Sequence, residues 1–365
     1  MSRPARFLAV LLAAFASLAF SAAALSAQAV RLAPPTRPAR FGVVTIDKVA
    51  YYNLAELAKY LELKGAWSDG KKIYTLTGKG PKLEFDLEGD GRKLLIDGLW
   101  VHLGNKAIVR GSNIFLSVTD YEHTLRGILS PRDAGVLPPV PQVIVLDPGH
   151  GGNDSGNTQN GLSEKVLTLD LANRLKVLLE GKGYRVVLTR TEDKALGPDK
   201  TQDLRARSDT ATAVGADLFV SIHFNSLDPA NNSAEKIAAT DGPEIYVFSP
   251  AGQGSTSSWQ SGKDDSEAKA MPVNQHDAWS SLLAHELHRT LVSQLKTTDR
   301  GQKTGHLGVL RNLDCPGVLV ESAFLSNPSE ARKVVTPEFR DQMAAAIAAG
   351  IESYAKTIKG LRAER

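Results

Sequence analysis

Short apolar runs of strand length alternate with helical patterns through the second half of this 365-residue chain. Between the runs, apolar residues recur every three or four positions, as they do on the buried face of a helix. The runs are rich in β-branched residues, which favours buried parallel strands; they are Val143–Leu146, Arg185–Thr189, Leu218–Ile222, Glu244–Phe248 and Val318–Val320. The alternation predicts an α/β fold, with a mainly parallel twisted sheet and helices on both faces.

Two residues predict where the last helix of the chain begins. Thr336 is the expected N-cap, because its hydroxyl can accept a hydrogen bond from the first turn. Pro337 follows at the first helical position, where its missing N–H costs nothing. The sequence therefore predicts that this helix begins at residue 337.

Two proline-rich segments divide the chain. Residues 130–141 (SPRDAGVLPPVP) contain four prolines and one glycine, which cannot form a helix or a central strand. Residues 30–40 are basic and proline-rich and are also expected to form a linker. We therefore predict a small domain over 41–129 and a larger one over 142–358.

The first 29 residues have the pattern of a secretory signal peptide. Arg3 and Arg6 precede a charge-free apolar run over 7–20, and small residues follow up to an A-x-A cleavage site at 27–29. An uncleaved membrane anchor is the alternative, but the apolar run is short for a span of about 20 residues. We expect an exported protein, periplasmic or secreted to the cell wall, with no stable membrane anchor after cleavage.

Composition excludes two classes of protein. The chain has 43 Lys and Arg against 40 Asp and Glu, so it lacks the basic field that nucleic-acid binding needs. Its single cysteine excludes an internal disulfide and a cysteine-based zinc finger. We therefore expect no nucleic-acid partner.

The segment 41–129 reads as a small α+β domain. Glycine-rich turns separate strand-like runs at 72–77, 82–87, 93–96 and 99–103. This pattern resembles the stalk domain named after the N-terminal region of copper amine oxidases, which occurs in many exported bacterial wall proteins. Its two histidines, His102 and His123, are isolated and form no ligand cluster. We expect the domain to bind or position cell-wall material.

Four chemistry-bearing residues lie where strands of the larger domain end. His150 follows the first strand, Glu164 opens the next helix, His223 ends the third strand and Glu321 directly follows the last. In parallel sheets, ligands bind beyond the carboxyl ends of the strands. We therefore expect these side chains to meet at one edge of the sheet.

The residue types suit a catalytic zinc site. Such sites commonly use two histidines and one glutamate and keep a fourth position open, while a second carboxylate moves a proton. His150, Glu164 and His223 are thus candidate zinc ligands, and Glu321 is the candidate acid and base. Each also has an ordinary role available: a hydrogen-bonded histidine, a favourable helix start or a structural salt bridge. The pattern alone leaves both interpretations open.

A second histidine pair is less suitable for a metal. His285 and His288 are three residues apart, whereas the zincin pattern needs a spacing of four. The apolar stripe of their helix places His285 on the opposite side. We therefore predict that the two histidines are a surface pair.

Six motifs of the larger domain occur in a characteristic order, and they are Val143–Gly152, Glu164, Val187–Arg190, Ser221–Asn225, Gly308–Asn312 and Val318–Pro328. Over nearly all of 142–356, the chain resembles the zinc-dependent N-acetylmuramoyl-L-alanine amidases of the amidase-3 type. The resemblance implies zinc held by His150, Glu164 and His223, with Glu321 as the catalytic residue. It also implies the substrate, which is the amide joining N-acetylmuramic acid to L-alanine in peptidoglycan.

One segment and two alternative functions remain open. Residues 249–277 form an insertion rich in serine, glycine and charge. We expect either a disordered surface loop or a lid on which an activator protein acts. The alternative functions are a non-catalytic peptidoglycan-binding or regulatory relative, and a zinc peptidase that cuts within the stem peptide.

Overall fold

The computed structural model describes residues 41–364 except 69, 71 and 89. The predicted signal peptide (1–29) and first linker (30–40) lie outside the described residues. Within the described part, no helix has the length and apolar character that a membrane span requires.

The second half of the chain contains the alternating elements that its sequence predicts. Its strands are β10 (Val143–Pro148), β11 (Thr158–Gln159), β12 (Leu162–Ser163), β13 (Arg185–Leu188), β14 (Leu218–Asn225), β15 (Glu244–Phe248), β16 (Gln302–Gly305) and β17 (Gly317–Phe324). Its helices are α3 (Glu164–Glu180), α4 (Lys200–Val214), α5 (Ala234–Ala238), α6 (Thr256–Ser261), η4 (Pro272–His276), α7 (Asp277–Leu295), α8 (Pro328–Val334) and α9 (Pro337–Ala363).

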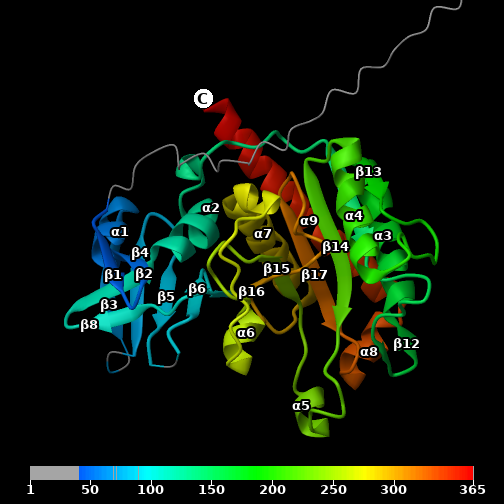
Figure 1. Ribbon diagram of the computed structural model, residues 1–365, viewed down its shortest axis with the longest axis horizontal. Coiled ribbons are helices and arrows are strands. Elements are labelled where there is room, and N and C mark those ends of the chain that lie inside the picture. The colour runs from blue at the N-terminus through cyan, green and yellow to red at the C-terminus, as the bar shows by residue number, and fades with distance from the viewer. Residues whose placement is uncertain (1–40, 69, 71, 89, 365) are drawn as a thin grey trace, which may run out of the picture. The chain divides into compact units, whose positions relative to one another are not determined.

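The central strands run parallel in the order β13-β10-β14-β17, which confirms the predicted α/β class. The strand β15 differs from the prediction, because it is antiparallel to β17. The short helix α5 lies beyond the carboxyl end of β14 (Figure 1), so the chain re-enters the sheet from that edge and runs back. The strand β16 is parallel to β15.

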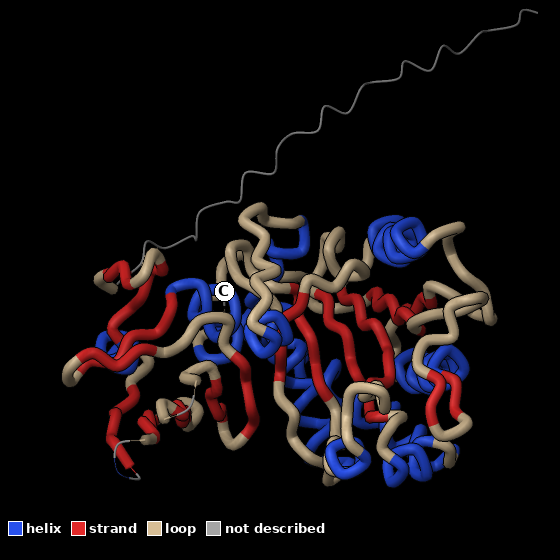
Figure 2. The backbone as a smooth tube through the Cα atoms, turned by 60° about the horizontal axis from the view of Figure 1, so that its bottom comes forward, coloured by secondary structure: helices blue, strands red, loops and turns tan. Residues whose placement is uncertain are grey.

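Helices cover both faces of this sheet, and Figure 2 shows the strands as a layer between them. The helices α3, α7 and α9 pack on one face through fully buried residues such as Leu175, Leu287 and Ile347. The helix α4 packs on the other face, where Ala211 contacts a core that includes Phe219 and Leu319. These two cores hold the strand ends that carry the candidate site.

The helix α9 begins at Pro337, as predicted. The Thr336 hydroxyl accepts a hydrogen bond from the Phe339 amide at 3.4 Å. Local side-chain chemistry thus sets the start of the longest described helix.

The small domain contains the predicted short strands. Its elements are β1 (Val43–Ile46), β2 (Val49–Asn53), α1 (Leu54–Tyr60), β3 (Leu63–Ser68), β4 (Ile73–Gly78), β5 (Leu83–Asp86), β6 (Lys93–Ile96), β7 (Leu99–His102), β8 (Ile108–Arg110), β9 (Asn113–Ser117), η2 (Asp120–Leu125), α2 (Arg126–Leu129) and η3 (Pro131–Asp133). The strands β3 to β7 form successive antiparallel pairs, and β1, β2, β9 and β8 form a separate sheet.

The strand β7 of the small domain joins the sheet of the larger one. It pairs in parallel with β16, where Val101 is the partner of Gln302, so that a single sheet of 11 strands results. Asp299 reinforces the junction, because its carboxylate accepts hydrogen bonds from the amides of Trp100 (2.8 Å) and Gly301 (2.9 Å). The junction ties residues 41–129 to the strand beside β15. The boundaries proposed for the two domains stay a prediction.

The insertion 249–277 contains the short helix α6 and the turn η4, which its sequence did not predict. Glu267 pairs with Arg311, with contacts of 2.5 and 2.6 Å. Thr256 lies against Thr304 of β16, with their hydroxyl oxygens 3.3 Å apart. The described side chains of the insertion therefore attach it to the larger domain.

The junction at Asp299 yields a stability prediction. Asp299→Ala removes the acceptor for two backbone amides and the partner of the buried His288 ring, and we expect it to lower the free energy of unfolding by about 2–3 kcal/mol. Urea denaturation followed by circular dichroism measures the change. The control is Asp341→Ala, because that carboxylate is 63% exposed in its pair with Arg174 and should contribute less than about 1 kcal/mol. Equal effects of the two substitutions would contradict the prediction.

Candidate metal centre

Two buried arginines fix the loop that carries His150. Arg207 donates from Nη2 to the His150 carbonyl and from Nη1 to the Pro148 carbonyl, both at 2.8 Å. Arg190 donates to the Gly149 carbonyl at 2.8 Å. His150 has φ +62°, in the left-handed region that non-glycine residues rarely adopt. The bond from Arg207 thus holds a strained backbone in place.

Asp147 anchors Arg207 beneath this loop. Its fully buried carboxylate accepts hydrogen bonds from Arg207 (2.8 Å), Thr189 (2.6 Å) and Ser221 (2.7 Å). Burial by itself would raise the pKa of Asp147, but the Arg207 charge and the two hydroxyl donors hold that pKa below its usual value. The hydroxyl of Ser221 therefore stabilises this ion pair.

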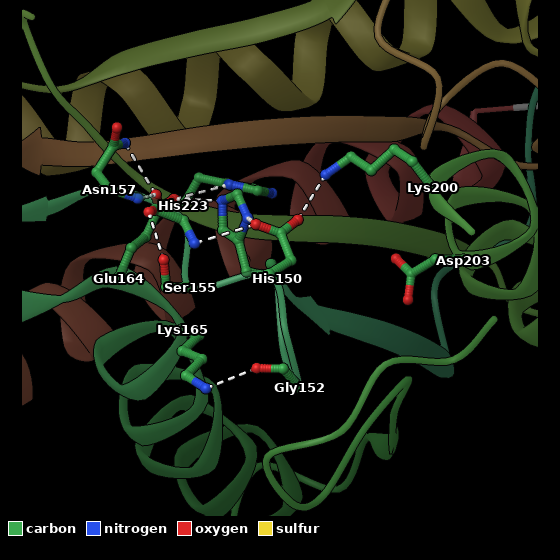
Figure 3. Close-up of polar contacts among 12 residues, drawn as sticks. His150, Gly152, Ser155, Asn157, Glu164, Lys165, Lys200, Asp203 and His223 are labelled. Atoms are coloured by element: carbon green, nitrogen blue, oxygen red, sulfur yellow. Dashed lines mark hydrogen bonds and ion pairs between the residues drawn. The ribbon is translucent and has the colours of Figure 1, made fainter. Parts of the chain in front are cut away.

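The three candidate ligands come together at the carboxyl edge of the sheet (Figure 3). Glu164 is the first residue of α3, and His223 lies on β14. The Glu164 Oε1 atom is 3.1 Å from His150 Nε2 and 2.9 Å from His223 Nδ1. The three ligand atoms lie within 4.8 Å of one another.

The geometry fits a shared divalent ion. Ligand atoms at 2.0–2.2 Å from a tetrahedral zinc lie about 3.4 Å apart, close to the two distances seen here. Two glycines let the backbone approach the ligand side chains closely: a Cβ on Gly149 would lie 2.2 Å from His223 Cε1, and one on Gly156 would lie 2.6 Å from Glu164 Oε2. The donor set and its glycine surroundings therefore suit a metal ion.

Further side chains orient the candidate ligands. Asn157 donates to Glu164 Oε2 from its backbone amide (2.8 Å) and its side-chain amide (2.9 Å). Asp154 lies 2.9 Å from His150 Nδ1 and pairs with Lys200 at 2.7 Å. Burial would raise the pKa of Glu164, but hydrogen bonds with His150 and His223 and their charges shift that pKa far below its usual range. Glu164 is therefore charged, as a metal ligand must be.

Glu321 lies beside the three candidate ligands, as expected. Its Cα pairs with that of His223 across the parallel strands β17 and β14. Its Oε2 atom is buried and has no hydrogen-bond partner among the described residues. Burial raises the pKa of Glu321 well above its usual value, and the negative charges of Glu164 and Glu244 raise it further, against the opposing charge of Lys303. A carboxyl group in this environment can carry a proton.

The prediction of a surface pair at His285 and His288 is wrong. Their exposed fractions are 8% and 1%. The helix α7 contacts α2 and η2 of the small domain as well as α9, so its outward side is also covered. Burial lowers the pKa of His285 to about 4, which keeps the ring neutral. The pattern of one helix could not show which neighbours surround it.

Residues 144–353, more than half of the chain, match the family described as N-acetylmuramoyl-L-alanine amidase, of the amidase-3 type. The chain belongs to this amidase family. This match confirms the amidase-3 family inferred from the six ordered motifs, while zinc dependence stays a prediction. The match covers His150, Glu164, His223 and Glu321.

This chain is similar to several named amidases, and it spans different shares of their lengths. The germination-specific N-acetylmuramoyl-L-alanine amidase of Bacillus subtilis is 30% identical over 60% of this chain and 81% of its own length. The amidase LytC of the same species is 35% identical over 60% of this chain, which spans only 36% of LytC. A solved amidase from Clostridium difficile matches 60% of this chain and 99% of its own, with 30% identity and a TM-score of 0.47.

The contacts to Glu164 yield a prediction about metal affinity. Asn157→Ala removes a side-chain donor from Glu164, and we expect it to weaken zinc binding by about tenfold. Competition with a fluorescent zinc chelator measures the affinity. Asn173→Ala is the matched control, because that side chain donates to a backbone carbonyl within α3 and should leave the affinity unchanged. An unchanged affinity in Asn157→Ala would refute the positioning role of Asn157.

Proposed function

We propose that this protein is a zinc-dependent hydrolase that cleaves the amide between N-acetylmuramic acid and L-alanine in peptidoglycan. The observation that carries the proposal is the convergence of His150, Glu164 and His223 beside Glu321. Membership of the amidase family supports the choice of substrate.

In this proposal, each residue has one task. His150, Glu164 and His223 hold zinc, which supplies a Lewis acid that polarises a carbonyl group and lowers the pKa of water. Glu321 accepts the proton of the attacking water and returns it to the departing L-alanine nitrogen. The register of β17 against β14 keeps Glu321 next to His223. The loop clamped by Arg207 keeps His150 in position.

The proposal predicts that Glu321→Gln abolishes release of peptide from glycan while the protein retains its zinc. The amide keeps the shape of the side chain but cannot accept the proton, so we expect a loss of at least about 100-fold. Peptide release from purified sacculi and elemental analysis measure the two properties. Glu352→Gln, on the exposed side of α9, should keep full activity. Substantial activity in Glu321→Gln would overturn its catalytic role.

Zinc dependence has a separate test. Dialysis against a strong chelator should remove peptide release, and stoichiometric zinc should restore it. Release that persists in metal-free protein would contradict the assignment.

The products separate this reaction from the alternatives. An amidase releases a peptide with a free L-alanine amino group, whereas a peptidase leaves L-alanine attached to the glycan. A non-catalytic relative binds sacculi and releases neither product. Mass spectrometry of the soluble fragments distinguishes the three outcomes.

Location and partners belong to the same proposal. We infer that the protein acts outside the cytoplasm, where peptidoglycan lies, after removal of the signal peptide predicted over 1–29. The comparison of 41–129 with the copper amine oxidase stalk stays a prediction, as does an activator that acts on 249–277. The described side chains of that insertion hydrogen bond to neighbours such as Arg311 and Thr304.

A further inference from the structure

A polar cluster lies one strand beyond Glu321 on the same face of the sheet. Glu244, the first residue of β15, is the partner of Glu321 in the antiparallel pair. Tyr246 is in turn the partner of Lys303 on β16. Because directly paired residues point to the same face, Glu244, Tyr246 and Lys303 continue the face on which His223 and Glu321 lie.

The Glu244 carboxylate is fully hydrogen-bonded although it is only 3% exposed. Its Oε1 atom accepts from Lys303 Nζ (2.6 Å) and Arg300 Nε (2.7 Å). Its Oε2 atom accepts from Asn225 (3.0 Å) and the Tyr246 hydroxyl (2.9 Å). Burial would raise the pKa of Glu244, but Lys303 and Arg300 hold that pKa below its usual value. The carboxylate is thus charged and needs no further partner.

The cluster contains two cations for this one carboxylate. Lys303 is buried, with an exposed fraction of 8%, and its ammonium group is directed at Glu244. No ion pair links Glu321 to Lys303 or Arg300 among the described residues. Arg300 and Lys303 thus share the Glu244 carboxylate, and Glu321 is a second acidic neighbour of Lys303.

Arg300 is the more exposed of these two cations. Its side chain is 29% exposed, and its guanidinium lies over the Phe324 ring, 4.9 Å from the ring centre. Only Nε is used by Glu244. The two terminal amino groups of the guanidinium donate to no described residue. Both are therefore available to bind a carboxylate with two parallel hydrogen bonds.

We propose that Arg300 binds a carboxylate of the peptide part of the substrate. This subsite deepens the proposed function and rests on it, and it assigns the peptide part of the substrate to the β15 side of Glu321. Phe324 and Glu244 fix the guanidinium, so that little conformational entropy is lost on binding. The ligand class is an anionic peptide.

The spacing of the strands indicates which residues of the peptide reach the subsite. From β14 through β17 to β15, two strand separations amount to about 10 Å. An extended peptide advances about 3.4 Å per residue. A carboxylate within the first three residues after the cleaved bond can therefore contact Arg300.

The test compares two substrates with the same scissile bond. One is a muramoyl tripeptide with every carboxyl group free, and the other is its fully amidated form. We expect the wild-type protein to favour the free acid, and Arg300→Gln to raise the KM for the free acid by about tenfold or more. The KM for the amidated form and both kcat values should change less than about twofold.

Two variants control for structural effects. Arg300→Lys keeps the charge but cannot form two parallel hydrogen bonds to a carboxylate. We therefore expect its KM for the free acid to lie between those of the wild type and Arg300→Gln. Arg289→Gln removes an exposed arginine of α7 that pairs with Glu286. It should leave KM and kcat unchanged for both substrates. A purely structural role for Arg300 would raise both KM values or lower both kcat values together, and that result would overturn the subsite.

A binding measurement separates failure of the subsite from failure of the proposed reaction. Isothermal titration with the free and the amidated tripeptide, each without its muramoyl group, needs no catalysis. Tighter binding of the free acid that disappears in Arg300→Gln supports the subsite. Equal affinities in both proteins overturn it, whatever the activity. Absence of cleavage of both muramoyl substrates by the wild type would instead refute the amidase reaction.

Discussion

The candidate metal centre depends on the buried ion pair between Arg207 and Asp147. Burying two charges is costly unless each is fully hydrogen-bonded, and here neighbouring hydroxyl and carbonyl groups complete both partners. The same guanidinium holds the carbonyl of His150, whose backbone is strained. The position of one imidazole therefore depends on an ion pair that includes neither of the two other candidate ligands.

The sequence predicted the parts of this protein that local chemistry determines. The apolar runs and helical stripes predicted the α/β class, and Thr336 and Pro337 set the start of α9. The four candidate site residues were proposed because the carboxyl ends of parallel strands, and the loops that follow them, meet at one edge of the sheet. In each case the prediction rests on a few neighbouring residues, and contacts with distant parts of the chain do not override their local preference.

Other features depend on contacts that no local pattern encodes. The direction of β15 follows from where α5 returns the chain, and the pairing of β7 with β16 joins residues 201 positions apart, from Val101 to Gln302. Burial of His288 depends on neighbours supplied by other elements. Asn157 and Arg300 lie outside the regular strands and helices, so neither residue stood out. The proposed role of Arg300 depends on its contact with Glu244, a residue 56 positions away in the sequence.

The shared sheet has a consequence for the boundaries of any shortened form. The family match begins at residue 144, and a fragment cut there would lose β7 and leave β16 as an open edge. Unpaired amides and carbonyls along such an edge recruit strands from other molecules. We therefore expect the small domain to protect β16 from such pairing, and the shortened form to self-associate more readily than the full chain.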